Sequence, residues 1–201
     1  MRRLGTTAAV LLLTGAGLLG TAGAAGAATV PTSATAPTGA AGPAGPGQAC
    51  STSWGSTNKT VTGAYAEPLR NIRTGRNACY DRMVFDIGGA QDGRVGYHVG
   101  YVDAFHQDGS GERIPVGGGA ILQIYVTAPS YDPSTGEQSY AGEAGKPLPG
   151  VDLSGYRTFR DTRFGASFEG QTQIGLGVRA RLPFRVTQSG DRLIVDVAHT
   201  W

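Results

Sequence analysis

Two segments far apart in the chain read almost alike, DRMVFDI at residues 81–87 and DRLIVDV at residues 191–197. In both, every second side chain is apolar: Met83, Phe85 and Ile87 in the first, Leu193, Val195 and Val197 in the second. Because successive side chains of a β-strand point to opposite faces, this period places each apolar set on one face. The two segments are therefore predicted to be half-buried strands whose apolar faces share one core.

The rest of the folded part repeats this pattern in short runs separated by turn residues. Strands are also expected at residues 69–74, 95–105, 120–128, 156–164, 171–179 and 184–187. Pairs such as Gly88-Gly89 supply the positive φ that tight hairpins need. No run keeps apolar residues at helical spacing for three turns, so no long helix is expected. The sequence thus predicts an all-β fold, an antiparallel β-sandwich in one domain over residues 50–201, with a barrel as the alternative.

Residues 129–155 form the longest stretch without a strand pattern, and Ser, Thr, Gly and Pro dominate it. A loop of this length in a compact domain is usually a binding element or a partly ordered insertion. Its composition favours the partly ordered insertion.

The N-terminus has the three parts of a secretory signal peptide. Arg2 and Arg3 give a positive start, an Ala- and Leu-rich run covers residues 8–19, and a small-residue cleavage pattern ends at Ala27. Residues 1–27 are therefore predicted to be a signal peptide, with cleavage after Ala24 as the alternative. The apolar run is shorter than the ~20 residues that cross a bilayer, so no transmembrane anchor is expected after cleavage. The mature protein is expected outside the cell, either free or associated with the wall.

Residues 28–49 contain no charged or aromatic side chain and consist mainly of Ala, Gly, Pro and Thr. Such a tract cannot bury enough apolar surface to offset its ordering entropy, so a disordered linker is predicted. A lipid anchor at Cys50 is the alternative. It is disfavoured because a lipid-modified cysteine directly follows the apolar run, whereas here the linker intervenes.

Removal of the signal peptide makes the chain electrically neutral. The 17 basic residues lose Arg2 and Arg3 and then equal the 15 acidic residues, all of which lie at Glu67 or later. With neither a basic excess nor a run of Lys and Arg, the sequence offers no nucleic-acid interface.

The chain has two cysteines, Cys50 and Cys79. An even pair in an exported protein predicts a disulfide. A catalytic thiol is the alternative, but no histidine neighbours either cysteine in the sequence.

An Arg-x-x-Arg pattern occurs twice, at Arg73 and Arg76 and again at Arg160 and Arg163. It reflects either a duplicated sandwich half or two strands that obey the same rules. Guanidinium groups bind carboxylates and phosphates, and tyrosine rings offer flat faces to sugars. The sequence therefore suggests a binding surface, in which the four arginines are joined by Tyr80, Tyr97 and Tyr101. The alternative reading is that these arginines are outward strand residues and the tyrosines cap the core.

Three motifs carry a family resemblance: NIRTGRNACYDRMVFDI, then GYHVGYV, and the closing LPFRVTQSGDRLIVDVAH. Over residues 69–201 the chain resembles the AMIN-like domain of secreted actinobacterial proteins and, more distantly, the AMIN domain. The resemblance implies a small β-sandwich that acts as a non-catalytic targeting module for peptidoglycan or cell-envelope assemblies. The cysteine pair and residues 129–155 are not part of the AMIN pattern.

Reactive motifs are absent from the sequence. There is no G-x-S-x-G elbow, and His98, His106 and His199 lack the spacing of a zinc site. Residues 108–112 have two carboxylates that could join a Ca²⁺ site, but a hairpin turn explains them equally well. No catalytic residue, metal or cofactor is therefore predicted.

The expected function is that of an exported, non-catalytic binding module whose partner is a cell-wall polymer or an envelope protein. One alternative is a wall glycan hydrolase that uses Asp86 and Asp196 as its carboxylate pair. Cross-strand pairing of these carboxylates with arginine is the simpler interpretation. The other alternative is a protein–protein interaction or inhibitor domain. The sequence does not indicate an oligomeric state.

Overall fold

The computed structural model describes residue 50 and residues 53–63, 67–89 and 94–201. The predicted signal peptide at 1–27 and linker at 28–49 lie outside the described residues. No helix in the described part of the chain is long and apolar enough to cross a membrane.

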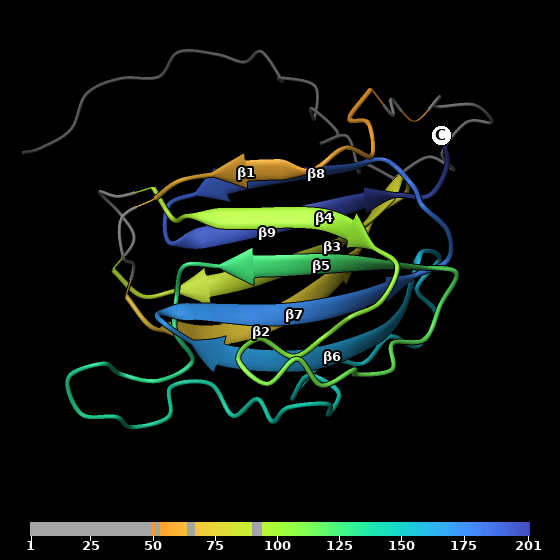
Figure 1. Cartoon of the computed structure of the whole chain (residues 1–201). Coiled ribbons are helices and arrows are strands. Elements are labelled where there is room, and N and C mark those ends of the chain that lie inside the picture. Colours follow the sequence, from red (N-terminus) through yellow and green to blue (C-terminus); the bar gives the residue numbers. More distant parts are fainter. Residues whose placement is uncertain (1–49, 51–52, 64–66, 90–93) are drawn as a thin grey trace, which may run out of the picture. The chain divides into compact units, whose positions relative to one another are not determined.

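The described residues form nine strands in two antiparallel sheets (Figure 1). The strands are β1 (Lys59–Val61), β2 (Leu69–Arg76), β3 (Tyr80–Ile87), β4 (Tyr97–Val102), β5 (Ala120–Val126), β6 (Phe159–Phe168), β7 (Gln171–Val178), β8 (Phe184–Ser189) and β9 (Arg192–Ala198). The larger sheet has the order β1-β4-β5-β7-β6 and the smaller one β2-β3-β9-β8. The predicted antiparallel β-sandwich is confirmed.

The two similar segments, residues 81–87 and 191–197, lie in β3 and β9, and these strands pair with each other. Phe85 lies opposite Leu193, and Met83 lies opposite Val195. All four side chains are fully buried in the core between the sheets. The larger sheet contributes alternate residues of its central strands to the same core, among them Leu122, Ile124, Ile174 and Leu176. The period of two therefore correctly identified which faces turn inward.

The strand expected at residues 95–105 ends earlier than predicted, at Val102. Its last apolar residue, Phe105, is fully buried, but it packs on the outer face of the larger sheet above Gly165 and Gly175. The side chain of Gln173 holds the same loop, because it accepts from Asp108 N at 2.9 Å and donates to His106 O at 2.8 Å. Residues 103–119, here called the β4–β5 loop, thus cover part of that face.

Residues 129–155 are ordered and packed against the sandwich, so the expectation of a partly ordered insertion was wrong. Tyr140 and Leu148 belong to the core cluster. Backbone hydrogen bonds fix the segment to β6, from Gly145 N to Phe164 O and from Phe164 N to Lys146 O, each at 2.9 Å. Val151 and Leu153 also pack against this cluster, and the four apolar residues have no periodicity that the sequence would reveal.

A buried polar network joins the two sheets. Asp81 in β3 accepts hydrogen bonds from Thr158 N (2.6 Å) and Phe159 N (3.1 Å), where β6 begins. The Thr158 hydroxyl lies 2.9 Å from Nδ1 of His199, which follows β9. The predicted disulfide is confirmed between Cys50 and Cys79, and Cys79 O accepts from His199 N at 2.9 Å. The disulfide is thus connected directly to the polar link between the sheets.

Candidate functional site

Two of the four arginines predicted to bind a ligand are occupied by nearby carboxylates. Arg73 projects from the outer face of the smaller sheet and pairs with Asp86, with Nε–Oδ2 at 2.9 Å. Arg163 pairs with Asp161 at 3.1 Å. The first pair joins adjacent strands, as expected from cross-strand pairing.

The other two arginines meet at Tyr156, although they come from different sheets. The Arg76 guanidinium, at the end of β2, lies 6.0 Å from the centroid of the Tyr156 ring. Arg160, at the start of β6, donates to Tyr156 O at 3.0 Å and to Phe159 O at 2.9 Å. The structure therefore brings Arg76 and Arg160 to one place, but leaves Arg73 and Arg163 in separate ion pairs.

The three predicted tyrosines lie apart from one another. Tyr80 stacks beneath the guanidinium groups of Arg82 (5.2 Å) and Arg185 (5.3 Å). Tyr97 lines a shallow pocket with Arg94, and Tyr101 lines a second pocket with Arg181. The seven predicted residues thus do not form a single surface, and their role in binding stays a prediction.

One end of the sandwich gathers arginines that have no carboxylate partner among the described residues. These are Arg76, Arg157, Arg160, Arg179 and Arg181, none of which has a described carboxylate oxygen within 4.0 Å. They lie where β2 and β7 end and β6 and β8 begin, at the end of the sandwich where the C-terminus lies (Figure 1). We call this set the arginine end.

Hydrogen bonds to backbone carbonyls hold several of these guanidinium groups in place. Arg160 donates to two carbonyls in the turn before β6 and to Phe159 O at the start of that strand, Arg157 donates to Ala78 O at 3.3 Å, and Arg179 donates to His199 O. Carbonyl oxygens orient a guanidinium without neutralising its charge. The arginine end therefore presents positive charge in fixed positions on a chain whose predicted mature form is neutral.

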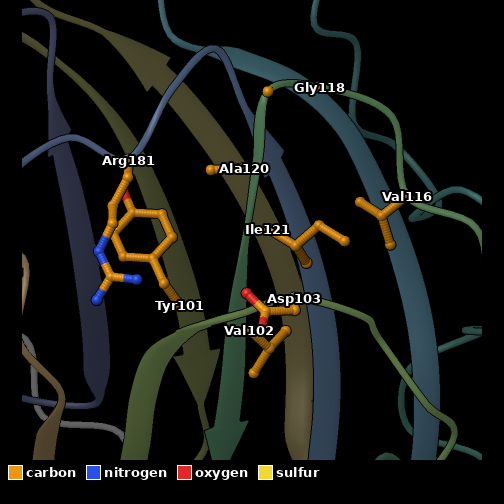
Figure 2. A pocket seen from close by; sticks show the side chains of 9 residues that line it. Tyr101, Val102, Asp103, Val116, Gly118, Ala120, Ile121 and Arg181 are labelled. Atoms are coloured by element: carbon orange, nitrogen blue, oxygen red, sulfur yellow. The ribbon is translucent and has the colours of Figure 1, made fainter.

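A pocket of about 390 Å³ opens at this end of the molecule (Figure 2). Its lining residues are Tyr101, Val102, Asp103, Val116, Gly118, Gly119, Ala120, Ile121 and Arg181. The hydroxyl of Tyr101 donates to Leu182 O at 2.8 Å and accepts from Leu182 N at 3.0 Å, so the ring is fixed. Burial raises the pKa of this phenol. The Arg181 guanidinium lies over the same ring, 5.0 Å from its centroid.

The rim of the pocket depends on glycine. Gly118 has φ +124°, a conformation that L side chains rarely adopt, and a Cβ there would lie 2.7 Å from Val178 O. A Cβ on Gly119 would lie 2.2 Å from Arg179 O. Only glycine lets this turn approach the end of β7 so closely. Nothing in the sequence of the Gly117–Gly119 run marks it as the wall of a pocket.

The carboxylates suggested for a glycan hydrolase do not form a catalytic pair. Asp86 lies opposite Arg192 and Asp196 lies opposite Arg82, which separates the two carboxylates by four residues along the strands. This spacing corresponds to about 13 Å, beyond the roughly 5–9.5 Å between the carboxylates of glycosidases. Each carboxylate is also bound by arginines, Asp86 by Arg73 and Arg192, Asp196 by Arg82 and Arg185.

Thr158, His199 and Asp81 have the residue types of a hydrolase triad, a grouping that their wide separation in the sequence does not reveal. Asp81 and Thr158 are fully buried, and His199 is 4% exposed. Nε2 of His199 lies 3.0 Å from Asn77 O, and Oδ1 of Asp81 is 3.9 Å away. Because the hydroxyl faces protein on all sides, the geometry is that of a structural link. Within the described ranges, no three His, Cys, Asp or Glu side chains group as metal ligands.

The fold and the site define a small antiparallel β-sandwich with an open pocket and an arginine-rich surface at one end. The AMIN-like domain model matches residues 67–199, so this chain belongs to the AMIN-like domain family. Membership confirms the resemblance seen in the sequence and indicates an envelope-associated binding module. No curated protein and no solved structure matches the chain.

Proposed function

We propose that this chain is an exported, non-catalytic module that binds an anionic polymer of the cell wall, such as peptidoglycan, through its arginine end. The observation that carries the proposal is the clustering of Arg76, Arg157, Arg160, Arg179 and Arg181 without described carboxylate partners. Arginine recognises carboxylate and phosphate oxygens through parallel N–H donors. Membership of the AMIN-like family supports an envelope ligand.

The fixed positions of the arginines favour a repeating polymer. Five positive groups at one end of the sandwich can engage several anionic units at once, and the effective concentration of each further contact raises the overall affinity. Each exposed pair contributes little in isolation. Binding is therefore expected to weaken as ionic strength rises, because salt screens exposed charges.

A sedimentation assay with purified, protein-free cell wall tests this proposal. The variant Arg76→Gln/Arg157→Gln removes two exposed guanidinium groups, and we expect its affinity for wall to fall about tenfold. Arg113→Gln is the matched control, because Arg113 is exposed on the β4–β5 loop and also has no described carboxylate partner. The control should bind like the unmodified chain.

Equal recovery of the chain with wall and with buffer alone would disprove the wall ligand. Recovery only with envelope from which proteins have not been removed would instead support an envelope protein as the partner. An equal loss in Arg113→Gln would show that binding depends on overall charge and not on the arginine end. Thermal unfolding of each variant establishes that a loss of binding is not a loss of folding.

A further inference from the structure

The pocket beside Tyr101 has an unusual charge pattern. Asp103 and Arg181 both line it, and neither side chain makes an ion pair with any described residue. Elsewhere in the described chain, five arginines pair with aspartates: Arg73, Arg82, Arg163, Arg185 and Arg192. The pocket therefore holds one positive and one negative group whose charges the protein does not neutralise.

Arg181 lies against a ring whose own position is fixed. Its guanidinium lies over Tyr101, whose hydroxyl is hydrogen-bonded twice to Leu182. Stacking occupies the flat face of the guanidinium and leaves its edge, with the N–H donors, available for a carboxylate. Because the ring is already fixed, little further ordering is needed when a ligand binds.

Asp103 directly follows the end of β4, and its carboxylate forms no described hydrogen bond. It is exposed, and more than 4.0 Å separates its oxygens from the Arg181 nitrogens, since the two form no ion pair. Figure 2 shows its carboxylate beside the half-exposed apolar side chains of Val102 and Ile121. The pocket thus combines an anion, a cation and an apolar wall.

We infer that this pocket binds a zwitterionic ligand of amino-acid chemistry, a free amino acid or a short peptide with small apolar side chains. The ligand carboxylate would lie at Arg181 and its ammonium at Asp103, with the side chain against Val102 and Ile121. A single ligand with both charges compensates both groups at once, which neither an anion nor a neutral sugar can do. A volume of about 390 Å³ lies near the lower end of the range of ligand sites, which suits a small ligand. The inference goes beyond the proposed wall binding, because it shares only Arg181 with the arginine end and requires neither Arg76 nor Arg157.

Chemical-shift titration of the full chain with alanyl-alanine tests the inference. Two capped forms are the matched probes: N-acetyl-alanyl-alanine has no ammonium, and alanyl-alanine amide has no carboxylate. We expect saturable shifts at residues of the β4–β5 loop and around Arg181 with the free dipeptide. Either cap should weaken binding at least about tenfold, because it leaves one charged group of the pocket unpaired.

Two variants and two controls locate the site. Asp103→Asn should remove the preference for the free ammonium, and Arg181→Gln should remove the preference for the free carboxylate. Arg113→Gln and Glu143→Gln alter exposed charges that line no described pocket, so they should bind like the unmodified chain.

Three results would overturn the inference. They are the absence of shifts with the free dipeptide, equal binding of the free and capped forms, and shifts that persist unchanged in both pocket variants. Equal binding of the free and N-acetylated forms alone would identify an anion site and would refute the role of Asp103. All of these outcomes leave the wall assay with Arg76→Gln/Arg157→Gln unaffected, so the two proposals can fail separately.

Discussion

Asp86 and Asp196 occupy the outer face of the same sheet, yet their surroundings differ. The Asp196 carboxylate is completely buried and accepts from Arg82 Nε at 2.7 Å and Arg185 Nε at 2.9 Å. The Arg185 guanidinium also lies over the Trp54 ring, 4.4 Å from its centroid. The Asp86 side chain is 25% exposed, and its arginine partners are about half exposed. Aspartate therefore has two different roles in these two similar strands: Asp196 is a buried partner of two arginines, and Asp86 forms exposed ion pairs.

Replacement of Asp196 by Asn should destabilise the fold by about 2–4 kcal/mol, because two guanidinium groups lose the anion that they share. Asp86→Asn is the matched control and should cost less than about 1 kcal/mol, as exposed pairs do. Urea unfolding of the two variants measures the difference. Equal free energies of unfolding would contradict the structural role assigned to Asp196.

The β4–β5 loop depends on glycines in the sheet below it. The Phe105 ring occupies the space that a side chain would need at position 175, since a Cβ there would lie 2.9 Å from the ring. Gly177 allows a similar approach by Gly117, whose carbonyl oxygen would be 1.8 Å from an added Cβ. The loop thus lies against β7 because two outward positions of that strand, 175 and 177, are glycine. As the same loop provides Asp103 and Val116, this packing also shapes the pocket.

Gly175→Ala should displace Phe105 and loosen the β4–β5 loop, at a cost of about 1–3 kcal/mol from overpacking. Hydrogen exchange at Ile114 N, which donates to Phe105 O at 2.9 Å, reports the loosening directly. Gly75→Ala is the control, because a Cβ at position 75 in β2 meets nothing within 4 Å. Unchanged exchange at Ile114 in Gly175→Ala would show that the loop does not depend on this contact.

The stability of the molecule as a whole should fall at alkaline pH. Burial raises the pKa of Tyr101 and, more strongly, that of Tyr140. The unfolded chain releases these protons near pH 10, whereas the folded chain retains them. Stability is therefore complete below about pH 10 and declines as pH rises beyond it, by up to about 1.4 kcal/mol per pH unit for Tyr140.

Urea unfolding at a series of pH values from about 9 to about 11 measures this decline. Tyr140→Phe removes the more strongly shifted phenol and should flatten the dependence. A dependence that is equally steep in the variant would show that Tyr140 is not its source.

The disulfide connects the beginning of the described chain to the polar network between the sheets. Cys50 and Cys79 are 29 residues apart, and closing a loop of that length stabilises the folded state by about 3 kcal/mol in the chain-entropy model. The double variant Cys50→Ser/Cys79→Ser should lose about that amount in urea unfolding. Reduction of the unmodified chain should give the same loss, and a reduced chain of undiminished stability would contradict the prediction.

The sequence alone determined every described strand except β1, together with the inward faces, the antiparallel sandwich, the disulfide and the family. These follow from local rules, because alternation, turn glycines and paired cysteines act over a few residues or through one covalent bond. Even the pairing of Arg82 with Asp196 is implied once β3 and β9 are known to be adjacent.

Only the tertiary structure decided which chemical groups meet. Arg76 and Arg160 lie together because β2 and β6 are the edges of different sheets, while Tyr101 and Arg181 meet because β8 begins beside the end of β4. The anchoring of the long loop by Tyr140 and Leu148 likewise depends on a core built from both sheets. Such contacts join residues far apart in the chain, and the periodicity of the sequence does not predict which distant residues come into contact.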